Sequence, residues 1–119
     1  MPGQLTDDEI THIRRNFKRC SEETIDSIVR FRQSRDLACV RPIVRGIVQR
    51  YLPASSAEML KNATDETPLA DLRIESLTLL EIVLYVQDAL DITIEDSEMR
   101  EFHTLGDVNR FLEKKIASA

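Results

Sequence analysis

The sequence predicts an all-α fold, and three observations support this prediction. The chain of 119 residues contains only three glycines and four prolines, too few for the many tight turns of a β-sandwich or barrel. Apolar residues recur at helical spacing in several segments, and no segment shows the alternation of a half-buried strand. Hydrophobic residues make up 42% of the chain and aromatic residues 5%, so the helices should pack around an aliphatic core. The length suits one small domain, alone or with an extension.

The charge is unevenly distributed along the chain. Residues 1–50 carry ten basic and seven acidic side chains, a balance of +3, and residues 51–119 carry six and fourteen, a balance of −8. An acidic second half argues against a nucleic-acid partner and favours basic protein partners. The arginines of the first half are expected to face solvent on their helices, or to take part in such a protein contact.

The chain shows no signal for a metal site or a membrane span. Cys20 and Cys39 have neither CxxC spacing nor paired histidines, so they predict either one disulfide or two free thiols. No apolar run approaches the length of a transmembrane helix, and no signal-peptide pattern is present. Two free thiols and a cytoplasmic location are therefore expected.

Residues 6–35 are expected to form two short amphipathic helices, joined as an αα-hairpin. Thr6 and Glu9 have the spacing of a capping box, and Ser21 begins the second helix. Each helix has one apolar face, made by Ile10, Ile13, Phe17 and Cys20 in the first and by Ile25, Ile28 and Val29 in the second. A pair this short buries little by itself. Whether it packs on the rest of the chain, dimerises or docks a partner is left open by the periodicity.

The next helix is expected to begin near Pro42, because proline suits the first turn of a helix, and to end before Pro53. Its buried stripe is broad and consists of Ile43, Val44, Ile47, Val48, Tyr51 and Leu52. Gly46 lies within this run and lowers its helix propensity, which indicates close packing of another helix at that point.

Residues 53–75 form a long connection, and long loops in small domains are often functional. A short turn of helix is expected around residues 57–61. The apolar residues expected to hold the loop against the core are Leu60, Leu69, Leu72 and Ile74.

Ser76 stands between this loop and a helix expected over residues 77–90, in a position suited to an N-cap. A helix N-terminus also favours a phosphate, because its backbone N–H groups are unpaired and the helix dipole is positive there. The helix is apolar around most of its circumference, so it is either central or offers one face to a partner. The plain interpretation is that Ser76 is only a cap and that at least one of Leu77, Leu80 and Leu84 packs in the core.

The remainder of the chain predicts an extended link at residues 91–94, a short acidic helix at 95–101 and a last helix capped by Thr104 with Asp107. The buried stripe of the last helix is formed by Leu105, Val108, Phe111, Leu112 and Ile116. From about residue 40 the order is therefore helix, long loop, helix, short helix, helix.

Several linked motifs give this succession a resemblance to a known family. Asp71-Leu72 precedes the turn, Glu75-Ser76-Leu77 follows it, and Glu81 stands five residues after the serine. Leu90-Asp91-Ile92-Thr93-Ile94 then leads into the acidic helix, and Thr104-Leu105-Gly106-Asp107-Val108 opens the last one. Residues from about 40 to 116 thereby resemble the acyl carrier protein family, which includes the peptidyl carrier domains.

The resemblance implies a four-helix bundle with a long loop between its first two helices, preceded here by two N-terminal helices. Residues 1–36 would form the N-terminal extension and residues 37–119 the carrier domain. Such a protein is not an enzyme. A phosphopantetheinyl transferase would attach 4′-phosphopantetheine from coenzyme A to Ser76. The protein would then pass thioester-linked acyl groups between the acyl-transferring, synthase or ligase enzymes of fatty-acid, lipid or secondary-metabolite biosynthesis.

The resemblance also implies roles for two further groups of residues. The partner-docking face would comprise Glu75, Leu77, Leu80, Glu81 and Leu84. The pocket for an acyl chain would be lined by Val83, Val86, Leu90, Phe102, Val108 and Phe111. A homodimer through the N-terminal helices is a further expectation. Neither a catalytic residue nor a metal ligand is implied.

Three departures from the family pattern suggest a specialised carrier with dedicated partners. Arg73-Ile74-Glu75 stands where the family usually has Gly-x-Asp, Thr78 replaces a frequent aspartate, and Gln87 replaces a common glutamate. An alternative function is a helical interaction module that keeps the bundle but carries no cargo. A serine hydrolase is disfavoured, because Ser76 is not set in a G-x-S-x-G motif.

Overall fold

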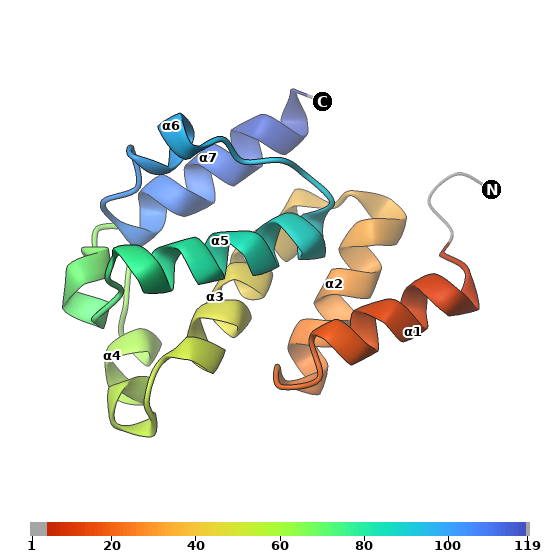
Figure 1. The fold of residues 1–119 in the computed structure, drawn as a ribbon, viewed down its shortest axis with the longest axis horizontal. Coiled ribbons are helices and arrows are strands. Elements are labelled where there is room, and N and C mark those ends of the chain that lie inside the picture. Colours follow the sequence, from red (N-terminus) through yellow and green to blue (C-terminus); the bar gives the residue numbers. More distant parts are fainter. Residues whose placement is uncertain (1–4, 119) are drawn as a thin grey trace.

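The computed structural model describes residues 5–118, apart from the side chain of Ala54. This part of the chain contains no strand, and its only β-type pairing is an isolated bridge between Pro68 and Thr104. The α-helices are α1 (Asp7–Asn16), α2 (Glu22–Ser34), α3 (Val40–Tyr51), α4 (Ala57–Lys61), α5 (Ser76–Leu90), α6 (Asp96–Met99) and α7 (Leu105–Ala117). In Figure 1, α5 crosses the molecule in front of α3, with α6 and α7 above it and the α1–α2 pair at the right. The predicted all-α fold is confirmed.

The two N-terminal helices pack on the same core as the rest of the chain. Thr6 and Glu9 form the predicted capping box of α1, and the hydroxyl of Ser21 accepts a hydrogen bond from the backbone N–H of Thr24 at the start of α2. Ile28 and Phe31 of α2 are completely buried in a core that also includes residues of α3, α5 and α7. The apolar faces of the pair are thus covered within the chain. Large exposed apolar side chains in the described residues lie elsewhere, at Leu37, Met59, Leu77, Leu80 and Leu84.

Gly46 allows α2 and α3 to approach closely, as its place in the apolar stripe predicts. A Cβ atom added at Gly46 would lie 2.0 Å from Oγ1 and 2.6 Å from Cγ2 of Thr24, which is buried on α2. The side chain of Thr24 therefore occupies the space that any larger residue at position 46 would need.

Replacement of Gly46 by alanine is expected to destabilise the protein, although alanine is the better helix former by about 1 kcal/mol. Forcing a methyl group against Thr24 costs about 1–3 kcal/mol, so a net loss is predicted. Urea unfolding followed by circular dichroism measures it. Adding Thr24→Ala removes the two closest atoms and should restore part of the loss. A Gly46→Ala protein as stable as the wild type would show that the two helices separate easily.

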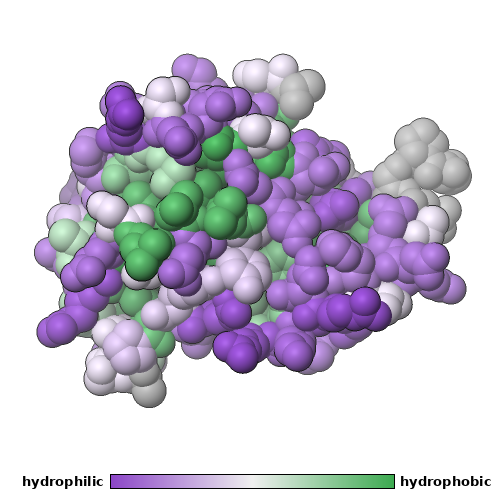
Figure 2. Space-filling view, in the orientation of Figure 1, coloured by the Kyte–Doolittle hydropathy of each residue, from purple (hydrophilic) through white to green (hydrophobic). Residues whose placement is uncertain are grey.

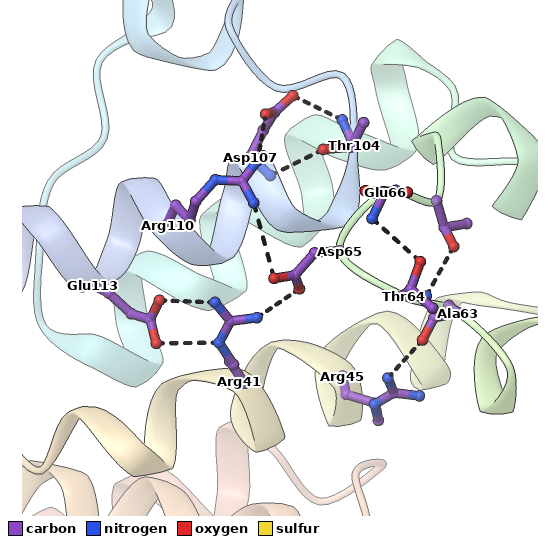
Figure 3. Close-up of polar contacts among 11 residues, drawn as sticks. Arg41, Arg45, Ala63, Thr64, Asp65, Glu66, Thr104, Asp107, Arg110 and Glu113 are labelled. Carbon is purple, nitrogen blue, oxygen red and sulfur yellow. Dashed lines mark hydrogen bonds and ion pairs between the residues drawn. The ribbon is translucent and has the colours of Figure 1, made fainter.

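The long connection between α3 and α5 is held by apolar and polar contacts. It contains α4 at the predicted place, and its four apolar residues (Leu60, Leu69, Leu72 and Ile74) are buried. Figure 3 shows the polar side, where the guanidinium of Arg41 on α3 pairs with Asp65 of the loop and with Glu113 of α7. Arg45 donates hydrogen bonds to the backbone carbonyls of Leu60 and Ala63. Both arginines keep solvent-exposed surface, as expected, and in addition they bind the loop within the chain.

The last helix begins with the predicted capping box of Thr104 and Asp107 (Figure 3). The carboxylate of Asp107 accepts hydrogen bonds from the backbone N–H groups of Thr104 at 2.9 Å and His103 at 3.0 Å, and from Arg110 at 3.1 Å. The hydrogen bonds from Thr104 and then His103 hold the pKa of Asp107 below its usual range. The acidic helix before it, α6, is shorter than the predicted 95–101, since only Asp96–Met99 is helical.

The capping box predicts a pH-dependent contribution to stability. Because the pKa of Asp107 is lower in the folded state than in the unfolded state, where it is about 3.9, the stabilisation is present above that pH. It is lost as pH falls through the folded pKa. Asp107→Asn should therefore cost about 1 kcal/mol near neutral pH. The difference from the wild type should shrink below about pH 4. Urea unfolding at several pH values tests this, and a constant difference down to pH 2 would contradict it.

Candidate functional site

The turn that leads to Ser76 is formed at the end of a short 3₁₀ helix. Residues Leu69–Leu72 form one 3₁₀ turn, closed by hydrogen bonds from the N–H of Arg73 to the carbonyl of Ala70 and from the N–H of Ile74 to the carbonyl of Leu69. This pairing is that of a Schellman motif, whose C′ residue adopts the left-handed conformation. Arg73 has φ 61° and ψ 30°, where glycine is unstrained. The Gly-to-Arg departure at this position therefore places a strained, exposed arginine three residues before the serine.

Ser76 is the first residue of α5 and is exposed to solvent. The N-cap is Glu75, so the prediction that Ser76 itself caps the helix is wrong by one position. The side chain of Glu75 makes no capping hydrogen bond, and the first turn of α5 contains no acidic residue. The first backbone N–H groups of a 15-residue helix are thus left without a side-chain partner beside the hydroxyl. A phosphate linked to Ser76 Oγ would fit this position, because the helix dipole and the free N–H groups favour an anion.

An apolar surface lies along α5 beyond the serine. Leu77, Leu80 and Leu84 are 69%, 40% and 55% exposed, and Figure 2 shows an apolar area on this face with hydrophilic residues around it. The expectation that at least one of these leucines packs in the core is wrong. The opposite side of α5 already fills the core with Ile82, Val83, Val86, Ala89 and Leu90. Glu75 and Glu81 are exposed beside the leucines.

Of the six residues predicted to line an acyl pocket, three are on the inward side of α5, Phe102 follows α6, and the other two are on α7. Val83, Val86, Phe102 and Val108 line one apolar cavity of about 10 Å³. Leu90 lies outside its lining and is completely buried. Phe111 also lies outside it, half-buried, with its ring edge-on to Phe102 at 5.2 Å between centroids. The rest of the lining comes from residues not predicted for it: Val44, Val48, Leu69, Ile74, Leu79, Ile82, Ile94 and Leu105.

Sequence reasoning also missed an aromatic cluster where α1 reaches α5. The guanidinium of Arg50 lies over the rings of Tyr51 and Tyr85, at 4.8 Å and 4.4 Å from their centroids. Phe17 packs edge-on against Tyr85. Tyr85 directly follows Leu84, the last exposed leucine of α5, so the contact with Phe17 brings the end of α1 close to the end of the apolar surface. The half-apolar character of Tyr85 on a helix without other aromatics was the one signal that could have indicated this contact.

Other reactive groups do not add to the site. Cys20 and Cys39 are free thiols, and burial raises the pKa of both. In residues 5–118 no cluster of three or more His, Cys, Asp or Glu side chains is arranged to hold a metal ion. Within the same part of the chain, none of the helices is both long and apolar enough to cross a bilayer.

Comparison with known proteins identifies the family. Residues 42–112 match the model of the family described as "Phosphopantetheine attachment site". The acyl carrier protein of Borreliella burgdorferi is 33% identical over 72 residues, which are 60% of this chain and 86% of that protein. The acyl carrier protein of an Exiguobacterium species is 41% identical over 46 residues, which are 39% of this chain and 58% of that protein. No solved structure is significantly similar to the chain.

The family match covers more than half of the chain, including α5 and Ser76, whereas α1 and α2 lie before it. The observed bundle agrees with it, since the matched residues contain most of α3, the long connection, α5, α6 and most of α7. The chain therefore belongs to the phosphopantetheine-attachment-site family, that of the acyl carrier proteins, and is a non-catalytic carrier of a covalently attached 4′-phosphopantetheine group.

Proposed function

We propose that Ser76 is the attachment residue and that the protein shuttles acyl groups between biosynthetic enzymes, with fatty-acid, lipid and secondary-metabolite synthesis as the candidate pathways. One observation carries the proposal. Ser76 combines an exposed hydroxyl with the uncapped N-terminus of the longest helix in the described residues. This position presents a phosphate to solvent and leaves the attached arm free to move, which are the two requirements of a carrier.

The attachment itself would be catalysed by a separate phosphopantetheinyl transferase. The Oγ atom of Ser76 would form a bond to the phosphorus of the phosphopantetheine half of coenzyme A. The pyrophosphate bond would break, adenosine 3′,5′-bisphosphate would leave, and the transferase base would take the hydroxyl proton. The thiol at the end of the group would hold acyl cargo as a thioester. The chain needs no general base beside Ser76, since the transferase supplies it.

The proposed docking face consists of Glu75, Leu77, Leu80, Glu81 and Leu84. Its apolar centre and acidic rim would suit an apolar patch bordered by basic residues on the transferase and on the synthases or ligases that exchange cargo. A homodimer through α1 and α2 would have to use polar surface, so it forms no part of this proposal. We place the protein in the cytoplasm, where its two free thiols would persist.

Incubation with a transferase and coenzyme A tests the proposal directly. Intact-mass spectrometry should show the addition of one phosphopantetheine, and peptide fragmentation should locate it on Ser76. Protein isolated from its own cell should carry the same addition. An unmodified protein in the cell, together with no loading by several transferases of differing specificity, would favour the alternative of an interaction module without cargo.

The docking face predicts a second result in the same assay. Leu84→Gln keeps a good helix former and removes an exposed apolar anchor, so kcat/KM for loading should fall by about tenfold or more. The time course of intact mass measures the rate. The matched control is Leu37→Gln, which alters an exposed leucine before α3 and should load at the wild-type rate. Equal loss in both variants would show that the α5 surface has no special role.

A further inference from the structure

The apolar cavity beside α5 holds little free space, and this bears on the cargo. Its free volume of about 10 Å³ is about the room that one water molecule needs. The cavity walls come from α3, α5, α7, the end of the long connection before α5 (Leu69 and Ile74) and the segments flanking α6. A chain of several methylene groups could enter only if these walls separated. The contacts that hold the walls together therefore decide whether an acyl group can be sheltered.

The walls formed by α3 and α5 are joined by α2. Thr24 of α2 fills the space over Gly46 of α3, while the side chain of Arg32 donates a hydrogen bond to the carbonyl of Asp88 at 3.0 Å. Arg35, at the end of α2, donates to the carbonyl of Leu90 at 3.0 Å. These carbonyls belong to the last turn of α5 and have no partner within the helix. Separating α3 from α5 would break these contacts.

The helix α1 adds a contact to the same end of α5. Nδ2 of Asn16 donates to the carboxylate of Asp88 at 2.9 Å, and Nε2 of His12 lies 3.7 Å from that carboxylate. We call the contacts of Asn16, Arg32 and Arg35 with α5 the brace. The brace is made entirely by the N-terminal helices that lie outside the family match.

The opposite wall, around α6, is tied as well. The backbone N–H of Ile94 donates to the side-chain oxygen of Gln87 at 2.6 Å, which gives a role to the residue that replaces the family's common glutamate. Nζ of Lys115 on α7 lies 2.9 Å from Glu98 of α6. The segment that follows α6 is then held by the backbone hydrogen bond from Leu69 to the carbonyl of His103.

We propose that this carrier presents its acyl group outside the bundle and serves short or polar acyl groups. The inference rests on the proposed function, because it requires a thioester arm on Ser76. A long apolar chain would remain in water, which is unfavourable, whereas a short or polar acyl group has little apolar surface to shelter. The six residues predicted to line an acyl pocket then serve to pack the core.

The reactivity of the thioester towards hydroxylamine tests this inference. The protein is loaded from acetyl-, hexanoyl- and decanoyl-coenzyme A by a transferase, and intact mass confirms each product on Ser76. Hydroxylamine then attacks the carbonyl carbon, the C–S bond breaks, and acyl hydroxamate and the free thiol form. Rates for the three chain lengths should agree within about twofold, whereas shelter of nine-tenths of the molecules would slow cleavage by about tenfold.

A variant without the arginine contacts tests the brace. Arg32→Ala/Arg35→Ala should let the long chain enter, so decanoyl cleavage should fall about threefold or more below acetyl cleavage. The matched control, Arg15→Ala/Arg19→Ala, removes two exposed arginines of the same extension that make no hydrogen bond or ion pair within residues 5–118. Circular dichroism confirms that both variants are folded. The control should behave as the wild type.

The possible results distinguish a failure of this inference from a failure of the proposed carrier function. Absence of any mass addition on Ser76 would overturn both. Normal loading with tenfold protection of the decanoyl thioester in the wild type would overturn only the inference. A folded Arg32→Ala/Arg35→Ala variant that still shows no dependence on chain length would overturn the role of the brace.

Discussion

Replacement of Ser76 by alanine will abolish phosphopantetheine attachment while leaving the fold intact. The change removes the one oxygen to which the phosphate would be joined, so the effect on loading should be complete rather than partial. Stability should change little, because Ser76 is exposed and the N-cap of α5 is Glu75. Intact mass after incubation with a transferase and coenzyme A measures loading, and urea unfolding measures stability.

Thr78 offers a matched control for this experiment. It is the next hydroxyl on the same turn of α5, and it is half-buried rather than exposed. Thr78→Ala should load at a rate near that of the wild type. If loading survives Ser76→Ala and disappears with Thr78→Ala, the attachment residue is Thr78 and not Ser76. Loading that survives both changes would place it outside the first turn of α5.

Replacement of Phe31 by alanine will destabilise the whole chain. Phe31 is completely buried in the core shared by α2, α3 and α5, and truncating such a phenylalanine costs about 3–5 kcal/mol. A domain of this size has a total stability of about 5–15 kcal/mol, so the loss would be a large part of it. Urea unfolding followed by circular dichroism should show one cooperative transition at a much lower midpoint.

The same measurement tests how the extension relates to the carrier domain. We propose that the extension (residues 1–36) and the carrier domain (residues 37–119) unfold as one unit, because a single core includes buried residues of both. Leu37→Ala alters a partly exposed apolar residue at the boundary and should cost much less than Phe31→Ala. A loss below about 1 kcal/mol for Phe31→Ala, or a separate early transition, would show that the extension is an independent layer.

Arg73 illustrates how a departure from the family pattern acquires a physical meaning. The sequence shows only that an arginine stands where glycine is usual, and that this weakens the expectation of generic partners. The structure adds that this position has φ 61°, in the left-handed region. An arginine there carries backbone strain of about 1–2 kcal/mol that a glycine would not. The side chain is exposed near the attachment residue, where its charge would be encountered by a docking enzyme.

Local sequence determined most of the helices of this protein. Capping boxes at Thr6 and Thr104, the proline in the first turn of α3 and the apolar stripes depend on residues within a few positions of one another. For that reason the order of helices, the short helix at 57–61 and the succession of motifs around Ser76 could be predicted without a structure. The buried leucines of the long connection could be predicted likewise, since a loop needs apolar anchors.

Only the tertiary structure decided what each apolar or charged face meets. Helical periodicity identifies a stripe but not its partner, so the sequence left the N-terminal pair unplaced and assigned a leucine of α5 to the core. Packing of α2 against α3 and α5 settled both questions, because the inward side of α5 was filled and its leucines were left exposed. The arginines that bind the last carbonyls of α5 lie more than 50 residues away in sequence, a separation that no local pattern records.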